Sequence, residues 1–198
     1  MPAEAPQTVV ATGFGPFGIY DVNSSWVAVQ ELSKRPLGDD IDLHIEEISV
    51  DYKTASELVP ELWKKYNPKL IVHVGVSGIA SKITLEQKAH NEGYDKCDVK
   101  GCCPENHCCV LGDEGCRVSG IDMQLVCRDI NEASSDVEAE VSQDAGRYLC
   151  DFTYFKSLSI DKSRAAFIHV PPLNTPYTAE QLAEGLRLAI LAMLKQVS

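Results

Sequence analysis

The sequence lacks the features that mark binding to nucleic acids or membranes. Its 18 Lys and Arg residues form no run longer than the pairs Lys34-Arg35 and Lys64-Lys65, and 29 Asp and Glu residues outnumber them. Phosphate backbones and anionic lipid surfaces attract clustered cations, whereas the formal net charge here is −11. No stretch approaches the roughly 18 consecutive apolar residues of a membrane-spanning helix. We therefore expect neither nucleic acid nor a membrane as a partner.

A secretory signal is also missing from the start of the sequence. Residues 1–7, MPAEAPQ, contain neither the basic region nor the apolar region of such a signal. The eight cysteines would suit a disulfide framework only in a short secreted chain. We expect free thiols and a cytosolic location, because the cytosol is reducing.

The composition is that of one globular domain. The 198 residues fit a single domain of roughly 100–200 residues, and a hydrophobic fraction of 44% allows a sizeable core. Apolar runs that favour strands alternate with helical patterns, which predicts βαβ crossovers. We therefore expect a single domain, residues 1–198, with a three-layer α/β/α sandwich around a mostly parallel sheet.

The individual elements can be placed approximately. Strands are expected at residues 8–12, 41–50, 70–76, 83–89, 137–141 and 165–170. Helices are expected at residues 24–35, 52–66 and 145–159, with two more beginning after Asp122 and Thr178. Asn23 or Ser24 can cap the first helix, and Thr178 and Gln181 match a capping box.

Residues 90–120 interrupt this alternation with a Cys-rich excursion of about 30 residues that holds six of the eight cysteines. Zinc sites usually take two ligands from a closely spaced cysteine pair, but these cysteines are either adjacent or at least four residues apart. His90-Asn-Glu92 matches the H-x-E of zinc deaminases without their P-C-x-x-C. We expect no metal, and a mobile loop in which Cys102-Cys103 and Cys108-Cys109 are exposed to oxidation. A metal-binding or redox-sensing module remains an alternative.

Two glycine motifs point to functions that the residues do not support. Residues 13–18 spell G-x-G-x-x-G, but Pro16 removes an N–H that a bound phosphate would need, and the next helix begins too late to hold a pyrophosphate. A nucleotide-binding oxidoreductase is therefore only an alternative, and Phe14 and Phe17 are better suited to line an apolar pocket. In residues 75–79, GVSGI, Ile79 replaces the second glycine of a nucleophile elbow, which argues against Ser77 as a nucleophile.

Cys150, His169 and Glu86 form a candidate catalytic set. Ligands in open α/β sheets collect beyond the carboxyl ends of the strands, where His169 and Glu86 are expected. An imidazole there could take the thiol proton of Cys150, and a carboxylate could orient the imidazole. A thiolate is stabilised in the first turn of a helix, although the helix start cannot be placed closely enough to decide this for Cys150. Each residue taken alone could equally be structural.

Six segments spread over essentially the whole chain carry a likeness to a known family. They are TGFGPFG, VNSSW, HVGVSG, TLEQKAHN, SQDAGRYLCDFTYF and FIHVPPL. Together they resemble the pyroglutamyl peptidase type I family, also called pyrrolidone-carboxylate peptidases, in its animal form. The resemblance implies a cytosolic cysteine peptidase of α/β/α fold that removes N-terminal pyroglutamate from peptides through a thioester, without metal or cofactor.

By the same resemblance, Cys150 is the nucleophile, His169 is the base and Glu86 is the orienting carboxylate. Phe14 and Phe17 would flank the lactam ring of the substrate. Bacterial members tend to carry Gln where this chain has Val76, so lactam recognition is expected to rely more on backbone groups. The partners implied are pyroglutamyl peptides. We expect a monomer, and a homo-oligomer stays open.

Overall fold

The computed structural model describes residues 6–18, 21–113 and 115–197. Its strands are β1 (Gln7–Phe14), β2 (Ile41–Ile48), β3 (Leu70–Val76), β4 (Ile83–Glu86), β5 (Lys88–His90), β6 (Cys116–Val118), β7 (Ala139–Ser142) and β8 (Ala165–Val170). Its α-helices are α1 (Ser24–Leu32), α2 (Tyr52–Tyr66), α3 (Met123–Ala133), α4 (Leu149–Asp161) and α5 (Ala179–Leu194). None of the helices within these described ranges is long and apolar enough to cross a membrane.

Six strands form one sheet in the order β2-β1-β3-β8-β4-β7. Neighbouring strands are parallel except β4 and β8, which pair antiparallel. The reason lies in the connection from β3 to β4, because residues 77–82 are too few for the crossover of a dozen or more residues that parallel strands need. The predicted, mostly parallel sheet is confirmed, and the reversal of β4 is a feature that the sequence pattern did not reveal.

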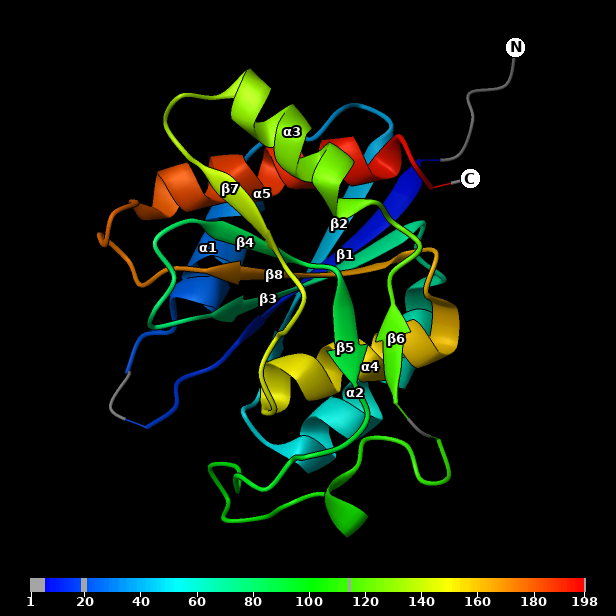
Figure 1. Ribbon diagram of the computed structural model, residues 1–198. Coiled ribbons are helices and arrows are strands. Elements are labelled where there is room, and N and C mark those ends of the chain that lie inside the picture. Colours follow the sequence, from blue (N-terminus) through cyan, green and yellow to red (C-terminus); the bar gives the residue numbers. More distant parts are fainter. Residues whose placement is uncertain (1–5, 19–20, 114, 198) are drawn as a thin grey trace.

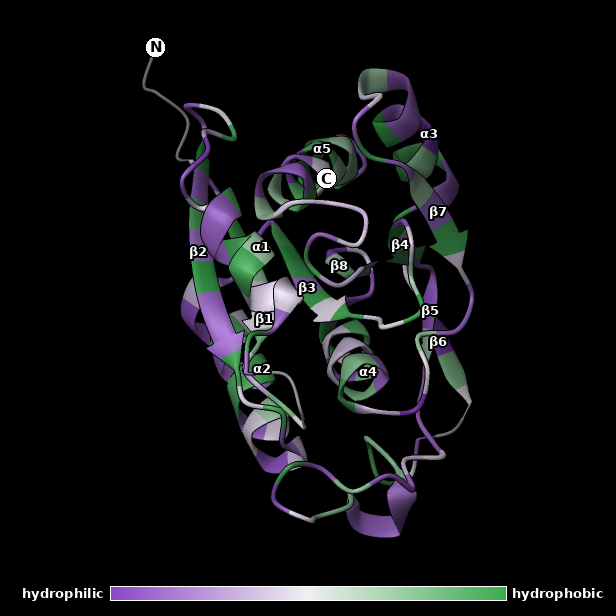
Figure 2. Cartoon of the chain, turned by 90° about the vertical axis from the view of Figure 1, so that its left-hand side faces the viewer, coloured by the Kyte–Doolittle hydropathy of each residue, from purple (hydrophilic) through white to green (hydrophobic). Residues whose placement is uncertain are grey.

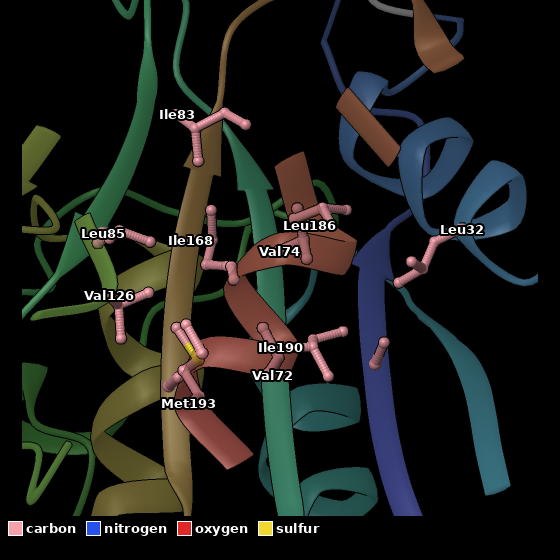
Figure 3. Packing of buried hydrophobic residues seen from close by; sticks show 14 of the residues in the cluster. Leu32, Val72, Val74, Ile83, Leu85, Val126, Ile168, Leu186, Ile190 and Met193 are labelled. Carbon is pink, nitrogen blue, oxygen red and sulfur yellow. The ribbon is translucent and has the colours of Figure 1, made fainter. Parts of the chain in front are cut away.

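Helices cover both faces of this sheet, as Figures 1 and 2 show. Helices α1, α3 and α5 lie on one face, and α2 and α4 lie on the other. Residues of β3 alternate between the two cores, since Leu70, Val72 and Val74 enter the first and Ile71 enters the second. Figure 3 shows the first core, in which side chains of α5 meet those of β3, β4 and β8. The predicted α/β/α layers are confirmed.

Local signals explain where several helices begin. The side chains of Asn23, Asp122 and Thr178 accept hydrogen bonds from first-turn N–H groups, and Thr178 forms the capping box predicted for α5. The helix predicted at residues 145–159 begins later, at Leu149. Gly146 has a φ of +84°, and this left-handed conformation excludes it from a right-handed helix.

The segment from Lys88 to Gly120 folds back on the second core through hydrogen bonds. Strand β5 pairs antiparallel with β6, and the Asn91 side chain bonds to the backbone of Val110 and Asp113. The prediction that both adjacent cysteine pairs are exposed is wrong for Cys109. That side chain is buried in the core beside α4, where its thiol donates to the carbonyl of Phe152 at 3.4 Å.

Candidate active site

Glu86 and His169 meet across the antiparallel β4–β8 pair. Glu86 is opposite Phe167 in the register, and His169 is opposite Thr84. Directly opposed residues share a face of the sheet, so Glu86 and His169 point to the same side. The Oε1 atom of Glu86 lies 2.8 Å from Nδ1 of His169, and both residues are buried. A carboxylate in this position fixes the orientation of the imidazole ring.

Cys150 approaches the same imidazole from α4. Tyr148 is the N-cap of this helix, which makes Cys150 the second residue of its first turn. A Cβ added to Gly75 would lie only 2.7 Å from the Cys150 Sγ, so glycine at the end of β3 makes room for the thiol. The thiol of Cys150 is close enough to the His169 imidazole to influence its charge. The imidazole of His169 therefore lies between the thiol and the carboxylate of Glu86.

The charge distribution around His169 favours its protonated form. Burial alone would lower its pKa, but interactions with Cys150 and Glu86 raise the pKa to about 10. The imidazole of His169 is therefore protonated at physiological pH.

His73 provides a contrast within the same protein. It is fully buried in β3 and hydrogen-bonds with the hydroxyl of Thr12 at 2.7 Å and that of Ser157 at 2.6 Å. Burial without a charged partner lowers the pKa of His73 to about 3, so this imidazole is neutral at physiological pH. We assign it to the core, although it lies in the family-like segment HVGVSG.

A pocket opens at the Cys150 thiol near the carboxyl ends of β1 and β3. Its lining contains the predicted residues Phe14 and Phe17, and Val76 borders it at the end of β3. The complete lining is Phe14, Phe17, Asn23, Val50, Val76, Tyr148, Leu149 and Cys150. None of these described side chains carries a full charge apart from the thiolate form of Cys150. The cavity therefore suits a small, uncharged and mostly apolar group.

Three of the lining residues were not predicted for this role. Asn23 was expected only as a helix cap, and it does cap α1, but its amide also donates to the carbonyl of Gly15 at 3.0 Å and so closes the TGFGPFG loop. Val50 was expected as the last residue of a strand, 41–50, but β2 ends at Ile48, and a position at the end of a strand does not by itself indicate a pocket. The sequence also gave no sign that Tyr148 would form a wall.

Glycine at position 13 is required for a packing reason rather than for binding a phosphate. A Cβ at Gly13 would lie 2.7 Å from the Cα of Trp26 and 2.9 Å from the carbonyl oxygen of Ser25. Helix α1 therefore packs directly on the end of β1. This close approach places the loop that carries Phe14 and Phe17 over the thiol.

Asp151, the neighbour of Cys150, ties the first turn of α4 to the segment that contains His90 and Tyr94. Its buried carboxylate accepts hydrogen bonds from the Tyr94 hydroxyl at 3.0 Å and from the His90 backbone N–H at 3.1 Å. Burial raises the pKa of Asp151 to about 6, although the bonds from Tyr94 and His90 oppose that rise. The sequence did not single out this residue.

The described cysteines do not assemble into a metal site. No group of three His, Cys, Asp or Glu side chains among the described residues could hold a metal ion. All eight cysteines lie within the described ranges and are free.

Known proteins share both the sequence and the fold. The model of a family described as pyroglutamyl peptidase matches residues 7–195. Pyroglutamyl-peptidase 1 of mouse and that of human are each 53% identical over 188 residues, which span 95% of this chain and 90% of each relative. The pyrrolidone-carboxylate peptidase of Thermococcus kodakarensis is 30% identical over 96% of this chain and 97% of its own length. The crystal structure of pyroglutamyl peptidase I from Bacillus amyloliquefaciens superposes with a TM-score of 0.85 at 24% identity, covering 96% of this chain and 97% of that one.

Proposed function

The chain belongs to the pyroglutamyl peptidase family, and we propose that Cys150, His169 and Glu86 carry out its reaction. The protein is a cysteine peptidase that removes N-terminal pyroglutamate from peptides. One observation carries the assignment of roles: Glu86 hydrogen-bonds to His169, and the imidazole lies beside the Cys150 thiol, which lines the pocket.

Acylation begins with the Cys150 thiolate. It attacks the carbonyl carbon of the pyroglutamyl residue, and a tetrahedral intermediate forms with negative charge on oxygen. When the intermediate collapses, the C–N bond breaks and the His169 imidazolium gives its proton to the departing amine. A thioester on Cys150 remains, and the shortened peptide leaves.

The backbone N–H of Cys150 is suited to stabilise the oxyanion. N–H groups in the first turn of a helix have no acceptor within the helix, and the N-cap residue Tyr148 provides no side-chain acceptor for them. A donor held in this way needs no reorganisation when charge develops on the substrate oxygen.

Deacylation uses the same groups in reverse. Neutral His169 takes a proton from water, and the resulting hydroxide equivalent attacks the thioester carbonyl. Pyroglutamate leaves, and the thiolate–imidazolium pair is restored. Glu86 holds the imidazole in one orientation through both steps and stabilises its positive charge. This sequence of steps uses no metal and no cofactor.

The pocket explains why a neutral ring is the recognised group. Phe14, Phe17 and Val76 offer apolar surface, and no cation is in place to hold a free carboxylate. Selectivity for the lactam over proline then depends on hydrogen bonds to its N–H and C=O, since unpaired partners in the pocket penalise a ring that lacks these groups. With Val76 at a position where bacterial relatives tend to carry Gln, backbone groups supply those bonds.

We also propose that residues 1–198 form one peptidase domain that acts as a monomer in the cytosol, without nucleic acid or membrane. Every residue of the proposed site comes from a single chain, the net charge is −11, and the eight free thiols suit a reducing compartment. Sedimentation of the active protein tests the monomer, and a faster-sedimenting active species would contradict it.

The roles are tested by hydrolysis of a fluorogenic L-pyroglutamyl amide in the presence of reductant. Cys150→Ser is expected to lower kcat by a factor on the order of 10⁴ or more. Cys102→Ser removes an exposed thiol outside the pocket lining and is the matched control, with rates equal to wild type. Equal rates for wild type and Cys150→Ser would remove Cys150 from the mechanism.

A further inference from the structure

Two thiols outside the active site lie in direct contact. The Sγ atoms of Cys97 and Cys103 are 2.8 Å apart, and neither residue takes part in the peptidase mechanism. Cys97 is exposed and Cys103 is half-buried. A disulfide needs an S–S separation of about 2.05 Å, so only a small movement separates this contact from a covalent bond.

The turn between the two cysteines holds them in this position. The buried Asp98 carboxylate accepts hydrogen bonds at 2.9 Å from the backbone N–H groups of Lys100 and Cys102. The Asp98 N–H donates to the carbonyl of Cys102, also at 2.9 Å. Gly101, with a φ of +76°, allows the chain to reverse. Because these hydrogen bonds already hold both ends of the turn, bringing the two thiols together loses no further conformational entropy.

The turn is also fastened to the rest of the protein. Asp98 accepts a hydrogen bond from the Tyr52 N–H at 3.0 Å, and the Tyr52 hydroxyl donates to the carbonyl of Lys96 at 2.9 Å. Lys96, next to Cys97, places its ammonium group 4.4 Å from the centre of the Tyr148 ring. The thiol pair is therefore part of an ordered structure beside the wall of the substrate pocket.

We propose that Cys97 and Cys103 are a redox modification site that forms a reversible disulfide with a low-molecular-weight disulfide such as oxidised glutathione as the oxidant. The proposal does not depend on the peptidase assignment. It rests on the contact between the two sulfur atoms and on the hydrogen bonds that hold the turn.

The reaction takes place in two exchange steps. The thiolate of exposed Cys97 attacks one sulfur of oxidised glutathione, and a mixed disulfide forms while one glutathione thiolate leaves. Cys103 then attacks the Cys97 sulfur as a thiolate, the mixed disulfide breaks, and the second glutathione leaves. The two protein protons end on the two glutathione molecules, and two electrons pass from the protein to the oxidant. The hydrogen bond with the Cys97 thiol raises the pKa of Cys103 to about 11, which disfavours Cys103 as the thiol that attacks first.

Neighbouring thiols are placed differently. Cys102 turns its thiol toward the carbonyl of Lys100 at 3.9 Å, and Cys108 turns toward the carbonyl of Asn106 at 3.4 Å. Cys109 is buried, and burial raises its pKa to about 12. These contacts make Cys102 the matched control for the pair, since it is adjacent in sequence and exposed but does not face Cys97.

The test uses the full chain with Cys150→Ser, so that the catalytic thiol cannot react. The reduced protein is incubated with excess oxidised glutathione, remaining thiols are alkylated, and the protease digest is mapped by mass spectrometry. A Cys97–Cys103 linkage that dithiothreitol reverses is expected, and adding Cys102→Ser is expected to retain it.

Adding Cys103→Ser is expected to leave Cys97 as a mixed disulfide with glutathione. Adding Cys97→Ser is expected to abolish the linkage without affecting the fold, because position 97 is exposed. Alkylation of both Cys97 and Cys103 after the incubation would overturn the proposal. A main product that links either of them to another cysteine would also overturn it.

Discussion

The Nδ1 atom of His169 lies 2.8 Å from the Oε1 atom of Glu86, although 83 positions separate the two residues in sequence. The antiparallel register of β4 and β8 creates this pair. Every other pair of neighbouring strands in this sheet is parallel. If β4 also ran parallel to β8, Glu86 would be paired in a different register and would no longer contact the imidazole of His169. The reversal of one short strand is therefore what completes the proposed site.

Removing the charge of Glu86 should shift the pH dependence of the enzyme. In Glu86→Gln the imidazolium of His169 loses an opposite charge, so the pKa of His169 falls, by about 1–3 units for a charge at this range. The alkaline limb of the kcat/KM profile is expected to move to lower pH by that amount, because activity requires the protonated imidazole for amine departure. The measurement is kcat/KM for a pyroglutamyl amide across pH.

Glu140→Gln is the control for this change. Glu140 lies on the adjacent strand β7, and its carboxylate accepts a hydrogen bond from the Thr84 hydroxyl at 3.2 Å rather than contacting His169. The profile of this variant should match wild type. An alkaline limb that stays in place in Glu86→Gln would show that the carboxylate does not set the charge on His169.

Shortening Phe17 should weaken substrate binding more than catalysis. Phe17 is half-buried at the pocket and is proposed to pack on the lactam ring. Phe17→Ala is expected to raise KM about tenfold or more, the effect of losing apolar contact in a specificity pocket, with a smaller change in kcat. Tyr66→Ala, which removes a half-buried ring stacked on His44, provides the control. Steady-state kinetics in which KM is unchanged would place Phe17 outside the binding site.

Asp151 should make stability depend on pH in a direction opposite to that of most carboxylates. Its pKa is about 6 in the folded protein, against 3.8 for an ordinary aspartate. The folded state therefore binds the proton more tightly, and the stability from this group is complete below pH 3.8 and is lost as the pH rises through 6. The loss amounts to at most about 3 kcal/mol.

Asp151→Asn removes this titration while it keeps an oxygen acceptor for Tyr94. The free energy of unfolding of the variant relative to wild type is therefore expected to rise between pH 4 and pH 7. Urea denaturation at several pH values measures it, with the exposed Asp21→Asn as control. Parallel stability curves for Asp151→Asn and wild type would rule out the raised pKa.

Asp51 should make stability depend on pH in the direction that is usual for a carboxylate. It caps α2, and its carboxylate accepts hydrogen bonds from the Thr54 N–H at 2.8 Å and from the Lys100 ammonium at 2.9 Å. Burial alone would raise its pKa, but the hydrogen bonds lower it to about 2. The stabilisation is present above the ordinary pKa of 3.8 and is lost as the pH falls through 2.

Asp51→Ala is expected to cost about 1–2 kcal/mol of unfolding free energy at pH 7, the usual effect of losing an N-cap. The difference from wild type should shrink as the pH falls toward 2. Urea denaturation at pH 7 and pH 3 checks both statements, and a difference of the same size at the two pH values would contradict the assignment.

Much of the sheet and its helices could be predicted because local signals were strong. Apolar β-branched runs located β1, β3 and β8, and side-chain caps located the starts of α1, α3 and α5. The start of α4 was missed by several residues, since the left-handed Gly146 and the extended Tyr148 depend on long-range packing. That detail decides whether Cys150 lies in the first helical turn.

The sequence could nominate Cys150, His169 and Glu86 from strand ends and motifs, but it could not show that they converge, because convergence depends on strand order and register. An antiparallel β4 within a mostly parallel sheet is not encoded in any local pattern of ITLEQ. The burial of Cys109 and the role of Asp151 were likewise invisible, since both depend on the segment from Lys88 to Gly120 packing against α4. The contact between Cys97 and Cys103 also required the folded turn.

The central claim, that Cys150 carries the acyl group, is tested most directly by trapping the intermediate. An activated ester of pyroglutamate acylates rapidly, so deacylation becomes rate-limiting and the thioester accumulates. After acid quenching and digestion, mass spectrometry is expected to find one pyroglutamyl group on the peptide that contains Cys150, together with a burst of released alcohol. Cys150→Ala should show neither signal. A pyroglutamyl group on another residue, or an unchanged burst in Cys150→Ala, would contradict the account.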